Sequence, residues 1–169
     1  MTPQLFWIDG PWPGRLAIST RPRGGDWLED EVLGWRRAGV DVLVSLLSTE
    51  EERDLELDNE AELSRAQGIR FVPFPVVDRG VPSSLPSTVE LLKDLRDDLQ
   101  AGKTVAIHCR QGIGRSSLIA AGLLVTAGID PQAAFYAVGS ARRLAVPETP
   151  EQRLWVERLW SDHLALVRE

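Results

Sequence analysis

The chain has 169 residues, of which 43% are hydrophobic and 26% charged, a composition that supports one apolar core and excludes a disordered chain. Its 19 basic and 25 acidic residues leave a formal charge of −6, which disfavours nucleic acid and anionic lipid as partners. The longest apolar stretch, residues 118–127, is too short to span a bilayer, and no basic region precedes the first apolar residues, so we expect no membrane anchor and no secretion.

The first third of the chain predicts strands separated by one helix. Short apolar runs within residues 5–18 flank a Gly-Pro-rich turn, as in two short strands. Asp26 with Glu29 has the spacing of a capping box, which predicts a helix that ends near Gly39. Residues 40–47 are β-branched and almost continuously apolar, which indicates a strand covered on both faces.

An acidic segment follows. Ser48 with Glu51 repeats the capping signal, and the chain to residue 67 is predicted to be helical with a break near residues 58–59. Eight acidic residues fall within residues 50–62. We interpret this run as a solvated helix face rather than as a site for a partner.

The rest of the chain continues to alternate. The predicted elements are a buried strand at 69–74, a proline-rich loop to residue 86, a helix from Ser87 to Gln100, a buried strand at 104–108, an apolar helix to Ala127, and helices at 131–143 and 149–168. This order predicts an α/β fold with a central, mostly parallel sheet flanked by helices. No repeat or linker interrupts the sequence, so residues 1–169 are predicted to form a single domain.

The residues that can carry chemistry follow the last predicted strand, in the loop His-Cys-Arg-Gln-Gly-Ile-Gly-Arg-Ser at 108–116. Ligands bind beyond the carboxyl ends of parallel strands, and the first amides of the next helix lack partners, so an anion is the expected occupant. Gly112 and Gly114 let the backbone curl so that amides converge, and Arg115 can hold two oxygens of a phosphate. The same amides favour the thiolate of Cys109, which places a nucleophile against a bound phosphate.

Other sites fit this loop less well. A nucleotide-binding Walker loop needs Gly-Lys before Ser or Thr, whereas residues 114–116 are Gly-Arg-Ser. Zinc needs several Cys or His ligands, and the chain has only His108, Cys109 and His163. Disulfide exchange and arsenate reduction need a second cysteine, and a rhodanese-like sulfur carrier does not explain the glycine pair before Arg-Ser. We therefore expect no metal and no cofactor, and a reducing, cytoplasmic compartment suits the single cysteine.

The loop resembles the signature of the cysteine-based protein tyrosine phosphatases, in particular the small dual-specificity group. The matching positions are His108, Cys109, Gly112, Gly114, Arg115 and Ser116. The resemblance implies that Cys109 attacks phosphorus and that water then hydrolyses a phosphocysteine. It also implies that the substrate's phosphate oxygens are bound by the loop residues Arg110, Gln111, Gly112, Ile113, Gly114 and Arg115. By the same resemblance Ser116 hydrogen-bonds the departing thiolate, while His108 either holds the loop and tunes Cys109 or simply fills the strand end.

The resemblance also calls for a proton donor on a loop about thirty residues before the cysteine. Asp78 lies 31 residues upstream of Cys109 (109 − 78) and is the only acidic residue between Ile69 and Leu85, so we expect it to be the general acid. Gln152 resembles the glutamine that orients the hydrolytic water in some members, with a first-turn helix residue as the alternative.

The sequence predicts a phosphatase that hydrolyses phosphotyrosine in phosphorylated protein substrates. A broader form of this prediction adds phosphoserine and phosphothreonine as substrates. Two alternatives stay open. A phosphoinositide or inositol phosphate phosphatase is disfavoured because such relatives commonly carry extra loop lysines where this chain has Arg110 and Gln111. A catalytically idle phosphate-binding module has no need of Cys109, Arg115 and Asp78 together. The sequence does not determine the oligomeric state, and a monomer is compatible with it.

Overall fold

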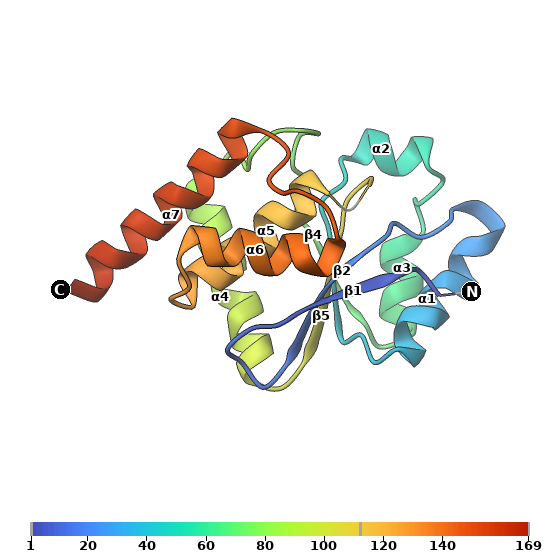
Figure 1. Ribbon diagram of the computed structural model, residues 1–169. Coiled ribbons are helices and arrows are strands. Elements are labelled where there is room, and N and C mark those ends of the chain that lie inside the picture. The colour runs from blue at the N-terminus through green and yellow to red at the C-terminus, as the bar shows by residue number, and fades with distance from the viewer. Residues whose placement is uncertain (1, 112, 169) are drawn as a thin grey trace.

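Five strands form one sheet in the order β1-β2-β5-β3-β4 (Figure 1). The computed structural model describes residues 2–111 and 113–168. The strands are β1 (Leu5–Ile8), β2 (Arg15–Ser19), β3 (Val42–Ser45), β4 (Arg70–Pro73) and β5 (Thr104–His108). Only the β1–β2 pair of this sheet is antiparallel, and the other three neighbouring pairs are parallel. The predicted α/β fold with a mostly parallel sheet is confirmed.

Helices cover both faces of the sheet (Figure 1). The helices are α1 (Leu28–Arg37), α2 (Thr49–Asp54), α3 (Glu60–Ala66), α4 (Leu85–Gln100), α5 (Gly114–Thr126), α6 (Pro131–Arg142) and α7 (Pro150–Arg168). α1 and α3 pack on one face, whereas α4, α5, α6 and α7 contribute to the larger core on the other. None of the described helices has the length and apolarity needed to cross a membrane.

The central strand β5 shows why its sequence is continuously apolar. Val105 and Ile107 belong to the core beneath α5, whereas Ala106 belongs to the core that α1 covers. All three side chains are fully buried. Because successive side chains of a strand point to opposite faces, a strand covered on both sides needs apolar residues at every position.

The helix start predicted at Ser48 is confirmed. The Ser48 Oγ accepts the amide of Glu51, and the Glu51 carboxylate accepts the amide of Ser48, which is a complete capping box. The predicted break also occurs, because residues 55–59 separate α2 from α3.

The helix start predicted at Asp26 is wrong. Gly25–Trp27 form a short 3-10 turn and α1 begins at Leu28, with no side-chain cap hydrogen bond at either start. The amide of Gly25 donates to the Glu56 carbonyl at 3.0 Å, and Gly25 has a φ of +59°, a conformation that favours glycine. A tertiary contact therefore decides how the chain enters this helix.

The start of α4 also differs from the prediction. Ser84, not Ser87, is the N-cap residue, and its Oγ accepts the amide of Ser87 at 3.3 Å. Pro86, which was expected in the irregular loop, lies in the first turn of α4. A proline is tolerated there because the first turn of a helix has no intrahelical partner for its amide.

Candidate active site

The loops that follow β3, β4 and β5 meet at one edge of the sheet, because these strands are parallel neighbours. Backbone hydrogen bonds join them: the amide of Leu46 donates to the His108 carbonyl, and the amide of Val76 donates to the Leu46 carbonyl, both at 3.0 Å. A cavity of about 150 Å³ lies at this edge. Its lining residues are Asp78, Arg79, Cys109, Arg110, Gln111, Gly114, Arg115 and Glu148. A larger groove of about 820 Å³ lies between α6 and α7, but Cys109 does not line it.

The structure brings most of the predicted phosphate-binding loop to this cavity. Arg110, Gln111, Gly114 and Arg115 line it, together with Cys109. Ile113 is the residue before α5 and is not among the lining residues. Gly112 falls outside the described residues.

Gly114 has a different reason to be glycine from the one expected. Its φ does not lie in the left-handed region, so the turn itself does not demand glycine there. A Cβ at this position would collide with the Glu148 carboxylate and press on the Gln152 side-chain amide. Glycine at this position therefore leaves room for the Glu148 carboxylate beside the first residue of α5.

The residue before Cys109, His108, forms a buried ion pair with Glu60. Its side chain is buried, and the His108 Nδ1 lies 3.4 Å from the Cys109 carbonyl oxygen. The His108 Nε2 lies 2.5 Å from Glu60 Oε1, and Trp35 stacks on the imidazole at 5.7 Å between ring centroids. Burial lowers the pKa of His108, but the charge and hydrogen bond of Glu60 outweigh it and raise the pKa above its ordinary value. Glu60 and Trp35 thus fix the His108 ring, and its role in tuning Cys109 stays a prediction.

Arg115 is held in place by the Glu51 carboxylate of α2. Its Nη1 and Nη2 donate to the two carboxylate oxygens of Glu51 at 2.7 and 2.9 Å. Nη1 also donates to the carbonyls of Val76 at 3.0 Å and Leu46 at 3.3 Å. Burial lowers the pKa of Arg115, but the hydrogen bond to Glu51 and the nearby negative charges outweigh it and raise the pKa above its ordinary value, so the guanidinium stays charged. A long, entropically costly side chain is therefore oriented before any phosphate arrives.

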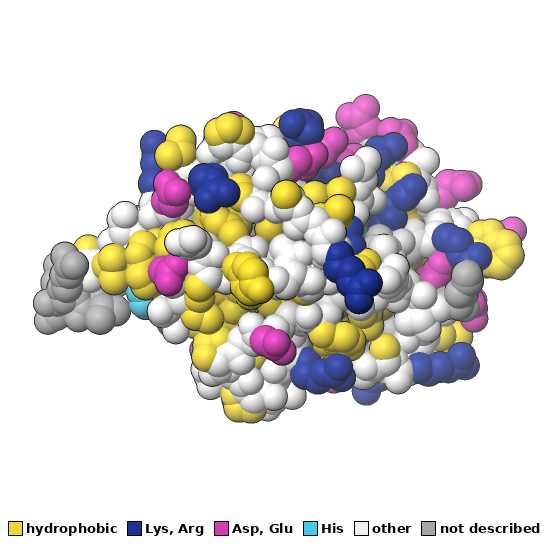
Figure 2. All heavy atoms as spheres, in the orientation of Figure 1, with side chains coloured by type: hydrophobic (Ala, Val, Ile, Leu, Met, Phe, Trp, Pro, Cys, Tyr) yellow, Lys and Arg dark blue, Asp and Glu magenta, His cyan; other side chains and the backbone are white. Residues whose placement is uncertain are grey.

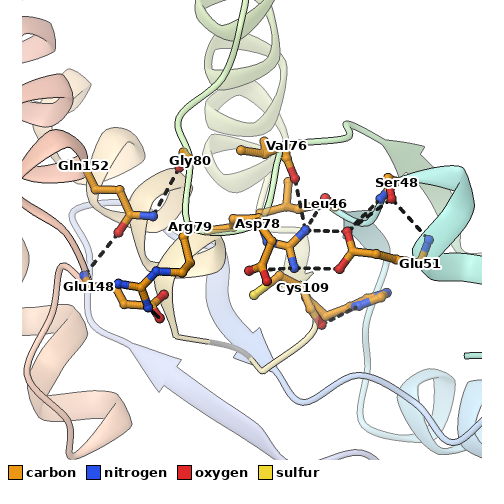
Figure 3. A network of polar contacts seen from close by, with 12 residues as sticks. Leu46, Ser48, Glu51, Val76, Asp78, Arg79, Gly80, Cys109, Glu148 and Gln152 are labelled. Atoms are coloured by element: carbon orange, nitrogen blue, oxygen red, sulfur yellow. Dashed lines mark hydrogen bonds and ion pairs between the residues drawn. The ribbon is translucent and has the colours of Figure 1, made fainter. Parts of the chain in front are cut away.

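Asp78 lies beside the cysteine and the arginine, as the general-acid prediction requires. Its Oδ1 is 3.5 Å from the Arg115 Nη2, and Figure 3 shows its carboxylate close to Cys109. The Asp78 side chain is 64% exposed, so water and a substrate's leaving group can both reach it. A proton donor next to the nucleophile and the anion-binding fork is the arrangement that phosphate-ester cleavage needs.

Comparison with known proteins agrees with this geometry. A sequence profile described as "Polymorphic toxin system, DSP-PTPase phosphatase" matches residues 19–129. The chain belongs to this phosphatase family. The predicted resemblance to small dual-specificity phosphatases is therefore confirmed.

Two curated relatives are forms of cyclin-dependent kinase inhibitor 3. The Rattus norvegicus protein is 28% identical over 119 residues, which are 69% of this chain and 56% of the relative. The Sus scrofa protein is 32% identical over 96 residues, which are 56% of this chain and 45% of the relative. The chain spans about half the length of these curated relatives.

Solved structures of phosphatases share the fold. Kinase associated phosphatase with serine in place of its catalytic-site cysteine has a TM-score of 0.89 at 20% identity, covering 98% of both chains. Tk-PTP in its active form has a TM-score of 0.77 at 27% identity, covering 94% of this chain and 97% of its own.

Ser116 and Gln152 are the remaining predicted residues of the phosphatase site. The Ser116 Oγ is fully buried in the first turn of α5 and has no hydrogen-bond partner among the described residues. Such an orphaned hydroxyl is available to a group that becomes charged during the reaction, which is compatible with the predicted bond to the departing thiolate. Gln152 is also buried, but it is not among the residues that line the cavity.

Sequence reasoning missed three carboxylates of the phosphatase site. Glu51 binds Arg115, Glu60 binds His108, and Glu148 lines the cavity. The interpretation of the acidic run as a solvated face is wrong for Glu51 and Glu60, whose carboxylates pair with Arg115 and His108. The capping box at Ser48 was the available signal, because it begins a helix directly after a strand whose carboxyl end faces the ligand.

Two further observations complete the site. Arg142 reaches the phosphate-binding loop from the end of α6: its Nη2 lies 3.5 Å from the Gln111 carbonyl oxygen, and its guanidinium lies over the Phe6 ring. Within residues 2–111 and 113–168, no group of three or more His, Cys, Asp or Glu is arranged to hold a metal ion.

Proposed function

We propose that this protein is a cysteine-dependent phosphomonoesterase that hydrolyses phosphotyrosine in proteins through a phosphocysteine intermediate, with phosphoserine and phosphothreonine as further substrates. The observation that carries the proposal is the meeting of Cys109, Arg115 and Asp78 at one cavity of about 150 Å³. A nucleophile, an anion-binding fork and a proton donor are the three groups that the reaction requires.

In the first step the Cys109 sulfur attacks phosphorus and forms a P–S bond while the bond from phosphorus to the leaving oxygen breaks. Asp78 gives its proton to that oxygen, so a neutral alcohol or phenol departs. Glu51 occupies the Nη1–Nη2 end of the Arg115 fork, and the phosphate would be held from the Nε and Nη2 side, where Asp78 also lies. The loop amides add donors to the phosphate oxygens.

In the second step water attacks phosphorus, gives a proton to the Asp78 carboxylate, and displaces the sulfur. The P–S bond breaks with its electron pair going to sulfur, which regenerates the thiolate and releases inorganic phosphate. The orphaned Ser116 hydroxyl would donate a hydrogen bond to that thiolate. The same aspartate therefore serves as acid in the first step and as base in the second.

Protein substrates and a cytoplasmic location belong to the same proposal. The solved relative named kinase associated phosphatase supports a protein substrate. A reducing compartment keeps the one cysteine of the chain in its reduced form.

The test compares wild type with Cys109→Ser on a generic aryl phosphate, on phosphotyrosine and phosphoserine peptides, and on phosphoinositides. We expect Cys109→Ser to lose turnover of every substrate while it still binds inorganic phosphate, because Arg115 and the loop amides are unchanged. Appreciable turnover by Cys109→Ser would rule out the mechanism. A preference for phosphoinositides over phosphopeptides would replace the proposed substrate class by the lipid alternative.

A further inference from the structure

Two contacts join the loop that carries Asp78 to the segment at the start of α7, and a third lies within that segment (Figure 3). The Arg79 Nη1 pairs with Glu148 Oε1 at 2.8 Å. The Gln152 Nε2 donates to the Gly80 carbonyl at 3.2 Å, and the Gln152 Oε1 accepts the amide of Glu148 at 3.1 Å. The segments are about seventy residues apart in the sequence, so only the tertiary fold brings them together.

Gln152 uses both ends of its side-chain amide in these contacts. It is fully buried, and both of its hydrogen bonds go to the backbone, one to each segment. It does not line the cavity that Cys109 lines. A glutamine that oriented the hydrolytic water would have to present its amide to that cavity, so the contacts favour a different role.

The contacts from Glu148 and Gln152 reach Arg79 and Gly80, the two residues that follow Asp78. Asp78 and Arg79 lie in a turn closed by the Gly80 amide, which donates to the Val77 carbonyl at 2.8 Å. Arg79 has a φ of +61°, an uncommon conformation for a residue with a side chain. Asp78 itself is largely exposed, so besides its contact with Arg115 the backbone of this turn determines where its carboxylate lies.

The segment at the start of α7 also contacts the phosphate-binding loop. Glu148 lines the cavity, and its carboxylate lies so close to Gly114 that a Cβ there would displace it. The start of α7 is thus in contact with both the acid loop and the first residue of α5. It therefore connects the loop of the proposed proton donor to the phosphate-binding loop.

We propose that Gln152 and Glu148 are positioning residues that latch the Asp78 loop over the cavity through Gly80 and Arg79. The inference rests on the proposed function, because it takes Asp78 as the general acid. It assigns Gln152 to the first chemical step, through the placement of Asp78, and not to the orientation of water in the second.

The experiment uses the full chain and two aryl phosphates, 4-nitrophenyl phosphate with an acidic leaving group and phenyl phosphate with a poor one. Arg79→Ala removes the ion pair, and Gln152→Met removes both hydrogen bonds at similar volume. A misplaced acid harms the poor leaving group most. We expect kcat for phenyl phosphate to fall about two- to fivefold in Arg79→Ala and about tenfold in Gln152→Met, with smaller losses for 4-nitrophenyl phosphate.

Three controls make the result specific. Arg79→Lys keeps a cation opposite Glu148 and should restore most of the phenyl phosphate rate. Arg36→Ala breaks an exposed ion pair elsewhere, with Asp41, and should leave both rates unchanged. Asp78→Asn should show the largest dependence on the leaving group, and if it shows none, the proposed general acid is wrong rather than the latch.

Two outcomes would overturn the inference while Asp78→Asn behaves as expected. The first is an equal loss on both substrates in Arg79→Ala and Gln152→Met. The second is a burst of phenol release with a slow second step in Gln152→Met, which is the signature of a residue that orients water. Arg79 is 62% exposed, so the fold tolerates its replacement. The rates of Arg79→Ala on the two substrates therefore test the inference even if Gln152→Met does not fold.

Discussion

Replacing Glu60 should lower the free energy of unfolding more than replacing an exposed residue does, although Glu60 does not line the cavity. Glu60 and His108 side chains are 1% and 0% exposed, with 2.5 Å between Oε1 and Nε2. Trp35 covers the imidazole, so little water can replace the lost partner. Glu60→Ala would leave a buried imidazolium without its counter-charge, and Glu60→Gln would keep the shape but not the charge.

The expected size of the effect follows from this burial. Breaking a buried pair by removing one partner costs about 3–5 kcal/mol, which we expect for Glu60→Ala. At about 2–4 °C per kcal/mol for a chain of this size, Tm should fall by roughly 6–20 °C. Glu60→Gln should cost about 1–3 kcal/mol, because an amide can still hydrogen-bond a neutral imidazole.

The pH dependence gives a second, independent signature. The pKa of His108 is raised in the folded state above its ordinary value of 6.5. The stabilisation from protonated His108 is therefore fully present below pH 6.5 and is lost as pH rises through the raised pKa. The difference in stability between wild type and Glu60→Gln should shrink over that interval.

Urea unfolding from pH 6 to 9 measures both quantities, with the midpoint compared at constant m-value. Glu62→Gln is the matched control, since Glu62 is exposed on the same helix and should change stability by less than about 0.5 kcal/mol. If Glu60→Gln behaves like Glu62→Gln, or if its deficit stays constant across the pH range, His108 is not a protonated partner of Glu60 and the reasoning fails.

Three further predictions concern catalysis and the other carboxylates. Asp78→Asn should lower kcat by roughly 100- to 10,000-fold and remove the alkaline limb of the pH–rate profile, and a profile that keeps this limb would contradict its role as acid. Burial raises the pKa of Glu51, but the hydrogen bond from Arg115 and the capping contacts of Ser48 outweigh it and leave the pKa below 4.5. This stabilisation is present above pH 4.5 and lost as pH falls through the lowered pKa, so Glu51→Gln should flatten the acid limb of stability in urea unfolding and lower kcat/KM about 10-fold. Peroxide should inactivate the protein through Cys109, and saturating phosphate should slow that inactivation; an unchanged rate would place the thiol away from the anion site.

The order of elements and the phosphate-binding loop could be predicted from local sequence. Strands such as Thr104–His108 are covered on both faces and so are apolar at every position. The cysteine, arginine and glycines of the loop are consecutive in the chain, so their spacing alone carries the chemistry. Ser48 and Glu51 form a capping box for the same reason, because the atoms that interact are three residues apart.

Contacts between segments that are distant in the sequence could not be predicted from local sequence patterns. The entry into α1 is decided by the Glu56 carbonyl, which binds Gly25, and not by the capping spacing of Asp26. Ser84 rather than Ser87 caps α4, and because both serines are able to accept an amide, residue type alone does not locate this helix start.

The acidic residues show most clearly what the sequence determines and what only the tertiary structure determines. Their number and clustering in residues 50–62 are visible in the sequence, but which of them turn inward depends on how α2 and α3 lie against the ends of β3 and β5. Packing places Glu51 against Arg115 and Glu60 against His108, while Glu62 stays in water. A buried charge needs a partner, and the partner of each of these carboxylates lies 48 to 64 residues away in the chain, so only the tertiary structure could assign them.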